Sequence, residues 1–283
     1  MRLVVQASGH QGSTISYSHL AHIHQMSHTS VQFVQTAEHC YYLANQTVSI
    51  DVQAFCAEQK IDCAYVHDHQ ILKHFGLCVM DMDSTLIGIE CIDEIADMVG
   101  IKAQISAITE RAMQGELDFA ESLRERVALL KGLKESDLMR VLNERLTLNP
   151  GAREWIATCK QHNITTLLVS GGFTFFADRV KDMLGLDYAV SNTLEIIDGK
   201  LTGCILGNIV DAQTKADTLI KLRDQLGLTT AQTIAIGDGA NDLKMMASAG
   251  ISIAYHAKPI VQAQASYALN FVGLDGVIGF LST

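Results

Sequence analysis

The stretch CVMDMDSTLIGIE, residues 78–90, joins an apolar strand to a pair of aspartates at its end. Side chains at positions i and i+2 of a strand point to the same face, so Asp81 and Asp83 would lie side by side. Two like charges at that distance raise each other's pKa and cost desolvation free energy. We therefore expect a bound cation that offsets this cost.

The strand in this stretch is one of several that lead into polar or glycine-rich turns. The others are TTLLVSGG, TIAIGDG and ISIAY, at 165–172, 233–239 and 251–255. Helical patterns follow some of these turns, as in TFFADRVKDML and NDLKMMASAG. This alternation predicts an α/β fold with a doubly wound parallel sheet, whose ligand site lies at the carboxyl ends of the strands.

Two excursions interrupt the alternation. Residues 90–150 are rich in Glu, Arg, Leu and Ala and read as helices, which predicts a helical cap inserted above the active edge of the sheet. Residues 192–207 alternate in polarity around a DGK turn, which predicts a hairpin.

The segment before the parallel sheet, residues 1–72, has a different pattern. Its apolar and helical runs follow the order βαββαβ, with strands expected at 2–8, 30–37, 40–45 and 61–67 and helices at 13–27, after a glycine-containing turn, and 49–60. The order is similar to that of ACT-type domains, which bind amino acids or pair into dimers; this likeness is one of architecture alone. We therefore expect a small regulatory or dimerisation domain at 1–72 and a catalytic domain at 73–283.

Composition limits the classes of partner and compartment. The formal net charge of -10 argues against nucleic-acid or anionic-membrane binding, but not against a small anion in a cleft that holds a metal. The seven cysteines lack a CxxC spacing and mostly lie in apolar runs, which is typical of buried free thiols in a reducing compartment. Residues 1–13 make a poor signal peptide, and no apolar run approaches the about 20 residues of a membrane span, so a cytoplasmic location is expected.

Four short stretches supply the groups that phosphoryl transfer needs. They are DMDST at 81–85, VSGGF at 169–173, DAQTKAD at 211–217 and GDGANDLKM at 237–245. A carboxylate can act as the nucleophile, Mg²⁺ prefers carboxylate and carbonyl oxygens, and hydroxyl, amide and lysine donors neutralise phosphoryl charge. The set therefore predicts a magnesium-dependent phosphotransfer site.

In this order, the four stretches resemble the haloacid dehalogenase-like phosphohydrolases, and among these most closely the phosphoserine phosphatase family. The resemblance covers roughly residues 75–283. It implies hydrolysis of O-phosphoserine to serine and phosphate, the last step of serine biosynthesis, through a phospho-aspartyl intermediate. A phosphatase for another small phosphate, or a phosphotransferase to an alcohol such as homoserine, remains an alternative.

The resemblance also assigns roles to the acidic residues. Asp81 would be the nucleophile, and Asp83 the acid/base that protonates the leaving oxygen and later activates water. Magnesium would be held by Asp81, the main-chain carbonyl of Asp83, and Asp238. Asp242, counted with the metal residues, and Asn241, on the substrate side, would support the site.

Phosphate binding is assigned to Ser170, Gly171 and Lys215. Ser170 leaves its strand into two glycines, and its hydroxyl and the neighbouring amides can donate to phosphate oxygens. A plain helix-capping role for Ser170 is compatible with that, since helix N-termini bind anions. Lys215 is the weaker assignment, because a solvated helix lysine would fit the same pattern.

The resemblance places substrate recognition at the cap. Glu90 would pair with the ammonium of serine and Arg126 with its carboxylate, for which a guanidinium offers two parallel donors. Met113 and Phe119 would shield the pocket from water. Surface ion pairs for Glu90 and Arg126, Arg124 in place of Arg126, and ordinary packing roles for Met113 and Phe119 are the alternatives.

Overall fold

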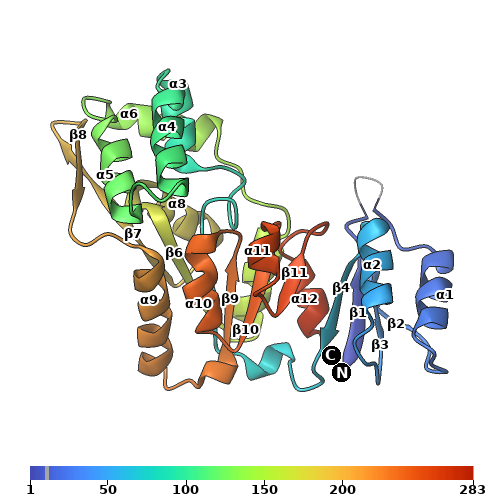
Figure 1. Cartoon of the computed structure of the whole chain (residues 1–283). Coiled ribbons are helices and arrows are strands. Elements are labelled where there is room, and N and C mark those ends of the chain that lie inside the picture. The colour runs from blue at the N-terminus through green and yellow to red at the C-terminus, as the bar shows by residue number, and fades with distance from the viewer. Residues whose placement is uncertain (10–12, 283) are drawn as a thin grey trace.

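The computed structural model describes residues 1–9 and 13–282, and within them the chain forms two sheets (Figure 1). The larger sheet has seven strands in the order β11-β10-β9-β5-β6-β7-β8. These are β5 (Leu77–Met80), β6 (Thr165–Phe173), β7 (Tyr188–Ile197), β8 (Lys200–Leu206), β9 (Thr233–Gly237), β10 (Ile251–Tyr255) and β11 (Tyr267–Leu269). All neighbours pair in parallel except β7 and β8. The predicted parallel sheet is confirmed.

Helices cover both faces of this sheet, as a doubly wound fold requires. In β5, Cys78 and Met80 point into one cluster, and Leu77 and Val79 into the other. The first cluster includes α7 (Ala152–Gln161), α8 (Thr174–Leu184) and α12 (Gly276–Leu281); the second includes α9 (Ala212–Gln225), α10 (Leu243–Ala247) and α11 (Pro259–Gln262). A strand buried on both faces has no polar side to alternate with, which explains its continuous apolar sequence.

The chain changes direction at β5. It adds β6 and β7 on one side, and then crosses over to add β9, β10 and β11 on the other. Chain segments that leave the carboxyl ends of β5, β6 and β9 therefore diverge and open a crevice, which is the place where sheets of this type bind ligands.

The predicted cap is present between β5 and α7. It consists of α3 (Cys91–Met98), α4 (Lys102–Met113), α5 (Phe119–Ala128) and α6 (Glu135–Glu144), which lie together above the carboxyl end of the sheet (Figure 1). A capping box at Asp118 starts α5. The predicted hairpin is also present as β7 and β8, and it meets the cap through the Gly132 amide, which donates to the Leu201 carbonyl at 2.8 Å.

The first part of the chain forms a four-stranded sheet with the predicted βαββαβ order. Its strands, in the order β2-β3-β1-β4, are β1 (Arg2–Gln6), β2 (Val34–Ala37), β3 (Cys40–Leu43) and β4 (Asp62–Val66); its helices are α1 (Tyr17–Met26) and α2 (Ile50–Glu58). Residues 10–12 of the expected turn before α1 lie outside the described residues.

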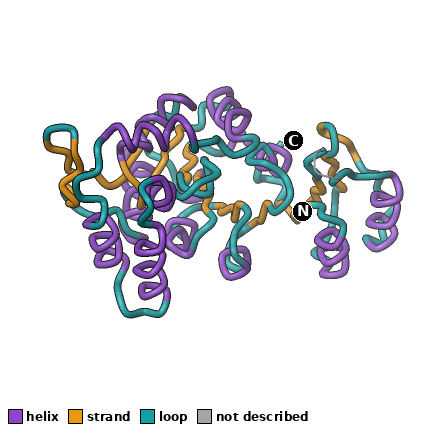
Figure 2. Tube along the Cα trace, turned by 90° about the horizontal axis from the view of Figure 1, so that it is seen from above, coloured by secondary structure: helices purple, strands orange, loops and turns teal. Residues whose placement is uncertain are grey.

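This smaller sheet packs against the larger unit as well as against its own helices. In β1, Leu3 and Val5 join the cluster of α1 and α2, whereas Val4 joins the main core together with Val277 and Phe280 of α12. Figure 1 shows α12 between the two sheets, and Figure 2 shows both chain ends near the junction of the two units. β1 thus buries both of its faces, whereas the edge strand β2 is exposed.

Buried and partly buried polar groups connect the two units across the junction. The carboxylate of Asp62 accepts hydrogen bonds from the amides of Asn270, Phe271 and Val272 at 2.8, 2.9 and 2.9 Å. Arg2 donates to the Phe280 carbonyl at 3.0 Å. Short turns complete the chain at Leu72–His74, Thr230–Gln232 and Ala240–Asp242.

Two further observations concern the whole described chain. Its cysteines are all free thiols, and Cys204 is the exposed one. Among residues 1–9 and 13–282, no helix combines the length and apolar character that crossing a membrane requires.

Candidate active site

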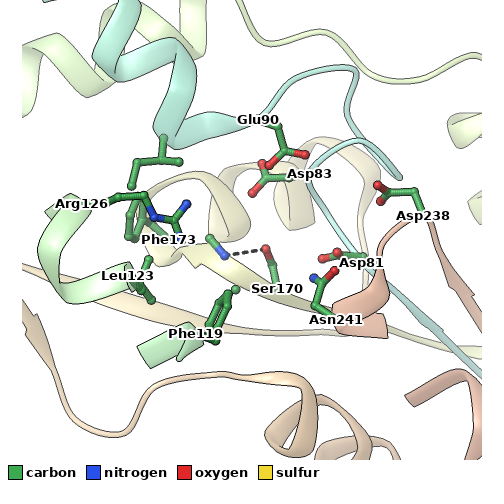
Figure 3. Close-up of a pocket in the computed structure, with 13 residues that line it drawn as sticks. Asp81, Asp83, Glu90, Phe119, Leu123, Arg126, Ser170, Phe173, Asp238 and Asn241 are labelled. Carbon is green, nitrogen blue, oxygen red and sulfur yellow. Dashed lines mark hydrogen bonds between the residues drawn. The ribbon is translucent and has the colours of Figure 1, made fainter. Parts of the chain in front are cut away.

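A pocket of about 130 Å³ lies at the carboxyl end of the seven-stranded sheet, beneath the cap. Its lining brings together most of the residues expected at the site, from β5, β6, β9 and α5. They are Asp81, Asp83, Glu90, Phe119, Arg126, Ser170, Gly171, Asp238 and Asn241, together with Ile92, Leu123, Gly172 and Phe173. Figure 3 shows Phe119, Leu123 and Arg126 on one side and Asp81, Asp238 and Asn241 on the other. The cap and the sheet thus share one cavity.

Asp81 lies at the bottom of this pocket, immediately after β5, and is buried beside Lys215 of α9. The Lys215 Nζ lies 2.7 Å from Asp81 Oδ2 and 2.8 Å from Asp242 Oδ1. Burial raises the pKa of Asp81 well above its usual value; Asp242 adds to the rise and Lys215 opposes it. Burial also disfavours the charge of Lys215, but Asp81 and Asp242 outweigh this and raise its pKa. The solvated alternative for Lys215 is ruled out by its 1% exposure.

Asp242 holds the loop after β9 in place. Its Oδ2 accepts hydrogen bonds from the amides of Asp238 and Gly239 at 3.2 and 3.1 Å. Gly237 is required beneath it, because a Cβ at that position would lie 2.5 Å from the Asp242 carboxylate. Both carboxylate oxygens of Asp242 therefore accept hydrogen bonds. In Asp238, Oδ1 accepts a hydrogen bond from the Thr85 hydroxyl at 2.7 Å.

Asp83 lies higher in the pocket, between the sheet and the first helix of the cap. Its Oδ1 accepts a hydrogen bond from the Cys91 amide at 3.3 Å. A Cβ on Gly172 would lie 2.7 Å from its Oδ2, so the missing side chain makes room for the carboxylate. Burial and the charge of Glu90 raise the pKa of Asp83 to about 7, which suits a group that exchanges protons near neutral pH.

The turn after β6 forms a small polar cradle opposite Asp81. Ser170 is buried, and its Oγ accepts a hydrogen bond from the Gly172 amide at 2.8 Å (Figure 3). Asn192 of β7 holds the turn from behind, since its Nδ2 donates to the Gly171 carbonyl and its Oδ1 accepts from the Val210 amide, each at 2.8 Å. The Ser170 hydroxyl and the open side of the turn face the cavity in which Asp81 lies.

The acidic groups at the bottom of the pocket fit a hard divalent cation. One oxygen from each of Asp81, Asp238 and Asp242 lies within 4.8 Å of the others. An all-oxygen set with room for water is what Mg²⁺ takes. Burial raises the pKa of Asp238 to about 6; the Thr85 hydrogen bond opposes the rise, and the charge of Asp242 adds to it.

The expected substrate groups lie at the mouth of the pocket, with one exception. Arg126 and Glu90 both line it, and the exposed Arg124 does not. Phe119, at the start of α5, reaches so far across that a Cβ on Gly171 would lie 3.0 Å from its Cζ. Met113 differs from the expectation: it is the last residue of α4, is 75% exposed and does not line the pocket, because that helix end projects beyond it.

Some residues at the site had no assigned role in the sequence analysis. Thr85 stands in the DMDST stretch, yet nothing in a linear pattern shows that its hydroxyl reaches Asp238. Asn192 gave no signal, because it lies in the hairpin stretch and its contact with Gly171 is made across the sheet. Leu123 and Phe173 also line the pocket, but in the sequence they look like ordinary apolar residues of a helix and of a strand end.

Comparison with known proteins agrees with this geometry. A family model described as haloacid dehalogenase-like hydrolase matches residues 75–250. The phosphoserine phosphatase of Vibrio cholerae is 52% identical over 223 residues, which cover 79% of this chain and 68% of the relative. The chain belongs to the phosphoserine phosphatases of the haloacid dehalogenase-like hydrolase family.

Solved structures extend the likeness to the whole chain. A crystal structure of a probable phosphoserine phosphatase from Vibrio cholerae, in unliganded form, matches with a TM-score of 0.87 and 41% identity, and covers 99% of this chain and 85% of that one. The structure of a substrate-bound phosphoserine phosphatase complex matches with a TM-score of 0.68 and 38% identity, over 74% of this chain and 99% of that one. The first of these matches includes the four-stranded unit as well as the catalytic unit.

Proposed function

We propose that this protein hydrolyses O-phosphoserine to serine and inorganic phosphate in two steps, with the phosphoryl group carried on Asp81 between them. The observation that supports this most directly is the single pocket that holds Asp81, Asp83 and Ser170 beneath Arg126 and Glu90. The lower part of the pocket holds groups that can bind and accept a phosphoryl group. Its upper part holds a cationic side chain for a carboxylate and an anionic one for an ammonium group.

In the first step an oxygen of Asp81 attacks phosphorus, and the bond between phosphorus and the serine oxygen breaks. Lys215, 2.7 Å from Asp81 Oδ2, favours the ionised nucleophile. Ser170 and the Gly171 turn donate to the phosphoryl oxygens as charge accumulates on them. Asp83 gives its proton to the departing serine oxygen, so that serine leaves as a neutral alcohol.

In the second step water attacks the phosphorus of phospho-Asp81. Asp83, now ionised, takes a proton from this water while the bond from phosphorus to the Asp81 oxygen breaks. Phosphate leaves and Asp83 is again protonated, ready for the next cycle. A pKa of about 7 lets one carboxyl group serve as acid and then as base.

Magnesium would be held by Asp81, the main-chain carbonyl of Asp83, and Asp238. Bound there, it would neutralise negative charge on the phosphoryl oxygens. We infer that Asp242 supports the site indirectly, because both of its oxygens already accept hydrogen bonds from Lys215 and the loop after β9. Asn241 lines the pocket beside the metal residues and would face the phosphate.

Recognition of the serine part would fall to the cap. Arg126 would bind the carboxylate and Glu90 the ammonium group, and Phe119 would exclude water from above the phosphate. Met113 could join them only if the end of α4 moved toward the pocket, since it is exposed in this arrangement.

Replacement of the nucleophile tests the mechanism. Asp81→Asn should abolish hydrolysis of phosphoserine and should not incorporate label from ³²P-phosphoserine, whereas the wild-type chain, quenched in acid during turnover, should carry label. The matched control is Asp51→Asn, the same substitution at an exposed aspartate of α2 in the first unit, and it should behave as wild type. Normal turnover by Asp81→Asn would refute the mechanism.

A second variant tests the substrate. Arg126→Ala should lower kcat/KM for phosphoserine by about 100-fold, since it removes a charged hydrogen bond of about 3 kcal/mol, and should leave p-nitrophenyl phosphate nearly unchanged. Arg124→Ala is the control on the same helix. Equal losses on both substrates would favour the alternative of a different small phosphate.

We also propose the division into a unit at 1–72 and a catalytic unit at 73–283 with its cap at about 90–150, a dimer formed through the first unit, and a cytoplasmic location. The edge strand β2 supports the dimer, because it lies at the edge of its sheet and all four of its residues are exposed. Sedimentation equilibrium of the full chain and of Gln35→Pro tests it: a dimer that Gln35→Pro converts to a monomer is expected, and a monomeric wild type would refute it.

A further inference from the structure

Between the nucleophile and Glu90 the chain makes a tight loop, residues 84–88, in which two hydroxyl side chains bond to residues that line the pocket. Ser84 has a φ of 56°, in the left-handed region that few residues other than glycine adopt. In that conformation its Oγ donates a hydrogen bond to Glu90 Oε1 at 2.6 Å. The next residue, Thr85, bonds to Asp238 instead. Two consecutive hydroxyl residues thus bind one residue at the rim of the pocket, Glu90, and one of the acidic residues at its bottom, Asp238.

The backbone of this loop is held from outside by Asn149, in the segment that leaves the cap. The Asn149 Nδ2 lies 3.3 Å from the carbonyl oxygen of Ser84, 2.8 Å from that of Thr85 and 3.1 Å from that of Ile87. The main chains also pair, since the Asn149 amide donates to the Leu86 carbonyl at 2.9 Å. The Asn149 side chain, whose nitrogen carries two N–H donors, and the Asn149 main chain therefore hold this loop at several of its carbonyls.

Glu90 needs such support more than the buried carboxylates do. It is an exposed residue at the rim of the pocket, with three rotatable side-chain bonds, and it caps no amide of α3 with its side chain. Holding such a side chain in one rotamer costs conformational entropy, which lowers affinity unless the free protein has already fixed it. The Ser84 hydroxyl is the hydrogen-bond donor that the structure supplies to this carboxylate.

We propose that Ser84 is a positioning residue that fixes Glu90 for an ammonium group on the substrate, and that Asn149 holds Ser84 in the required backbone conformation. The proposal rests on the proposed function, because it takes Glu90 as the partner of the amino group. It adds a specificity device that depends on both chain segments that connect the cap to the core.

Two variants at position 84 separate the hydroxyl from the backbone. Ser84→Ala removes the hydroxyl, and Ser84→Gly removes it while easing the left-handed conformation. The effect of losing the hydroxyl can therefore be measured on one variant even if the other folds poorly. Both should raise KM for phosphoserine about tenfold with little change in kcat, a loss within the range for a hydrogen bond to a charged group.

The matched probe is 3-phosphoglycerate, which keeps the phosphate and carboxylate of phosphoserine but has a hydroxyl in place of the ammonium group. Its inhibition constant against p-nitrophenyl phosphate hydrolysis should change less than about twofold in both variants, since no ammonium group is involved. An equal loss of affinity for phosphoserine and 3-phosphoglycerate would overturn the role of Ser84. So would an unchanged KM for phosphoserine.

Asn149→Ala should show the same selective rise in KM for phosphoserine, with the same indifference toward 3-phosphoglycerate. Asn149→Asp, which removes the donor and adds a negative charge beside three carbonyl oxygens, should show an effect in the same direction that is at least as large. Asn143→Ala, on the exposed face of α6, is the control and should behave as wild type. Loss of thermal stability without a selective change in KM would reduce Asn149 to a structural role and overturn that half of the proposal.

Failure of the proposed function would give a different result from failure of this inference. If the wild-type chain does not hydrolyse phosphoserine, the function is wrong. If the wild type hydrolyses it and the Ser84 variants lose no selectivity between phosphoserine and 3-phosphoglycerate, the function stands and the inference is wrong.

Discussion

Asp81 and Asp83 show how position alone separates two chemically identical residues. Asp81 lies beside Lys215 at the bottom of the pocket, which favours its ionised form as a nucleophile. Asp83 lies near Glu90 and the Cys91 amide, under conditions that raise its pKa to about 7. The carboxylate that must attack is paired with a cation, and the one that must exchange a proton is not.

Replacement of Asp83 should therefore affect the two steps unequally. With p-nitrophenyl phosphate the leaving group needs no proton, so Asp83→Asn should still form phospho-Asp81 but should hydrolyse it about 100-fold or more slowly. Rapid mixing should show a burst of one p-nitrophenolate per active site followed by slow turnover. With phosphoserine both steps should slow and no burst of serine should appear. A steady rate without a burst on the aryl substrate would contradict this assignment.

Magnesium binding should depend on pH through Asp238. Burial raises the pKa of Asp238 to about 6, so below that pH this carboxyl group holds a proton that the ion must displace. Below pH 6 the affinity should fall by about tenfold per pH unit for the proton that Asp238 must release, and above about pH 7 it should level off.

Calorimetric titration with MgCl₂ at pH 5.5, 6.5 and 7.5 checks this expectation. Repeating each titration in two buffers of different ionisation enthalpy counts the protons released. Asp238→Asn should bind weakly at every pH and should release fewer protons. An affinity that does not vary with pH would show that the carboxylates are already ionised in the free protein.

At the scale of elements, the contact between α5 and the turn after β6 joins the cap to the sheet. A Cβ on Gly171 would lie 3.0 Å from Phe119 Cζ, so the ring and the glycine form a matched pair. Gly171→Ala should push the ring aside and lower kcat/KM, and Phe119→Ala should lower it by letting water into the pocket. The double variant should lose less than the product of the two.

The expected coupling is about 1 kcal/mol, or about fivefold in kcat/KM, as for other residues in contact. Gly171→Ala combined with Met139→Ala, a half-exposed position on α6, should be additive and serves as the control. Additivity between Gly171 and Phe119 would mean that the cap does not rest on the turn during catalysis.

At the scale of the whole molecule, the four-stranded sheet is part of the packing of the catalytic unit. Val4 and Val66 share the main core with α12, and Asp62 accepts three amide hydrogen bonds from 270–272. Burial raises the pKa of Asp62, and the three amides oppose that rise. A chain that began near residue 73 would leave these amides unpartnered and would expose the apolar face of α12, so we expect it to aggregate.

Asp62→Ala tests this junction without truncation. Loss of the carboxylate leaves three amides without an acceptor, that of Val272 in a buried place, and should lower the free energy of unfolding by about 3 kcal/mol. Urea denaturation followed by the fluorescence of Trp155, which is buried in the main core, measures the effect. Asp68→Ala, at an exposed ion pair with the N-terminus, should cost less than about 1 kcal/mol. Equal effects would show that the junction adds little to stability.

Local patterns in the sequence were sufficient to predict the order of elements, the parallel sheet, the helical cap and the set of acidic, hydroxyl and lysine residues at the site. These are local properties, because apolar periodicity follows the two-residue repeat of a strand or the 3.6-residue repeat of a helix, and the motifs leave strand ends that one sheet edge must bring together. The family resemblance also predicted that Glu90 and Arg126, some 36 positions apart in the chain, would lie together at the substrate pocket.

Other features of the site and of the fold became visible only in three dimensions. The exposure of Met113, the reach of Thr85 to Asp238, the support of Gly171 by Asn192, and the union of the small sheet with α12 all depend on how side chains far apart in the chain meet. Polarity patterns state that a residue is buried or exposed, but not which partner covers it. A hydrogen bond such as that from Ser84 to Glu90 depends on a left-handed backbone angle that no periodicity records.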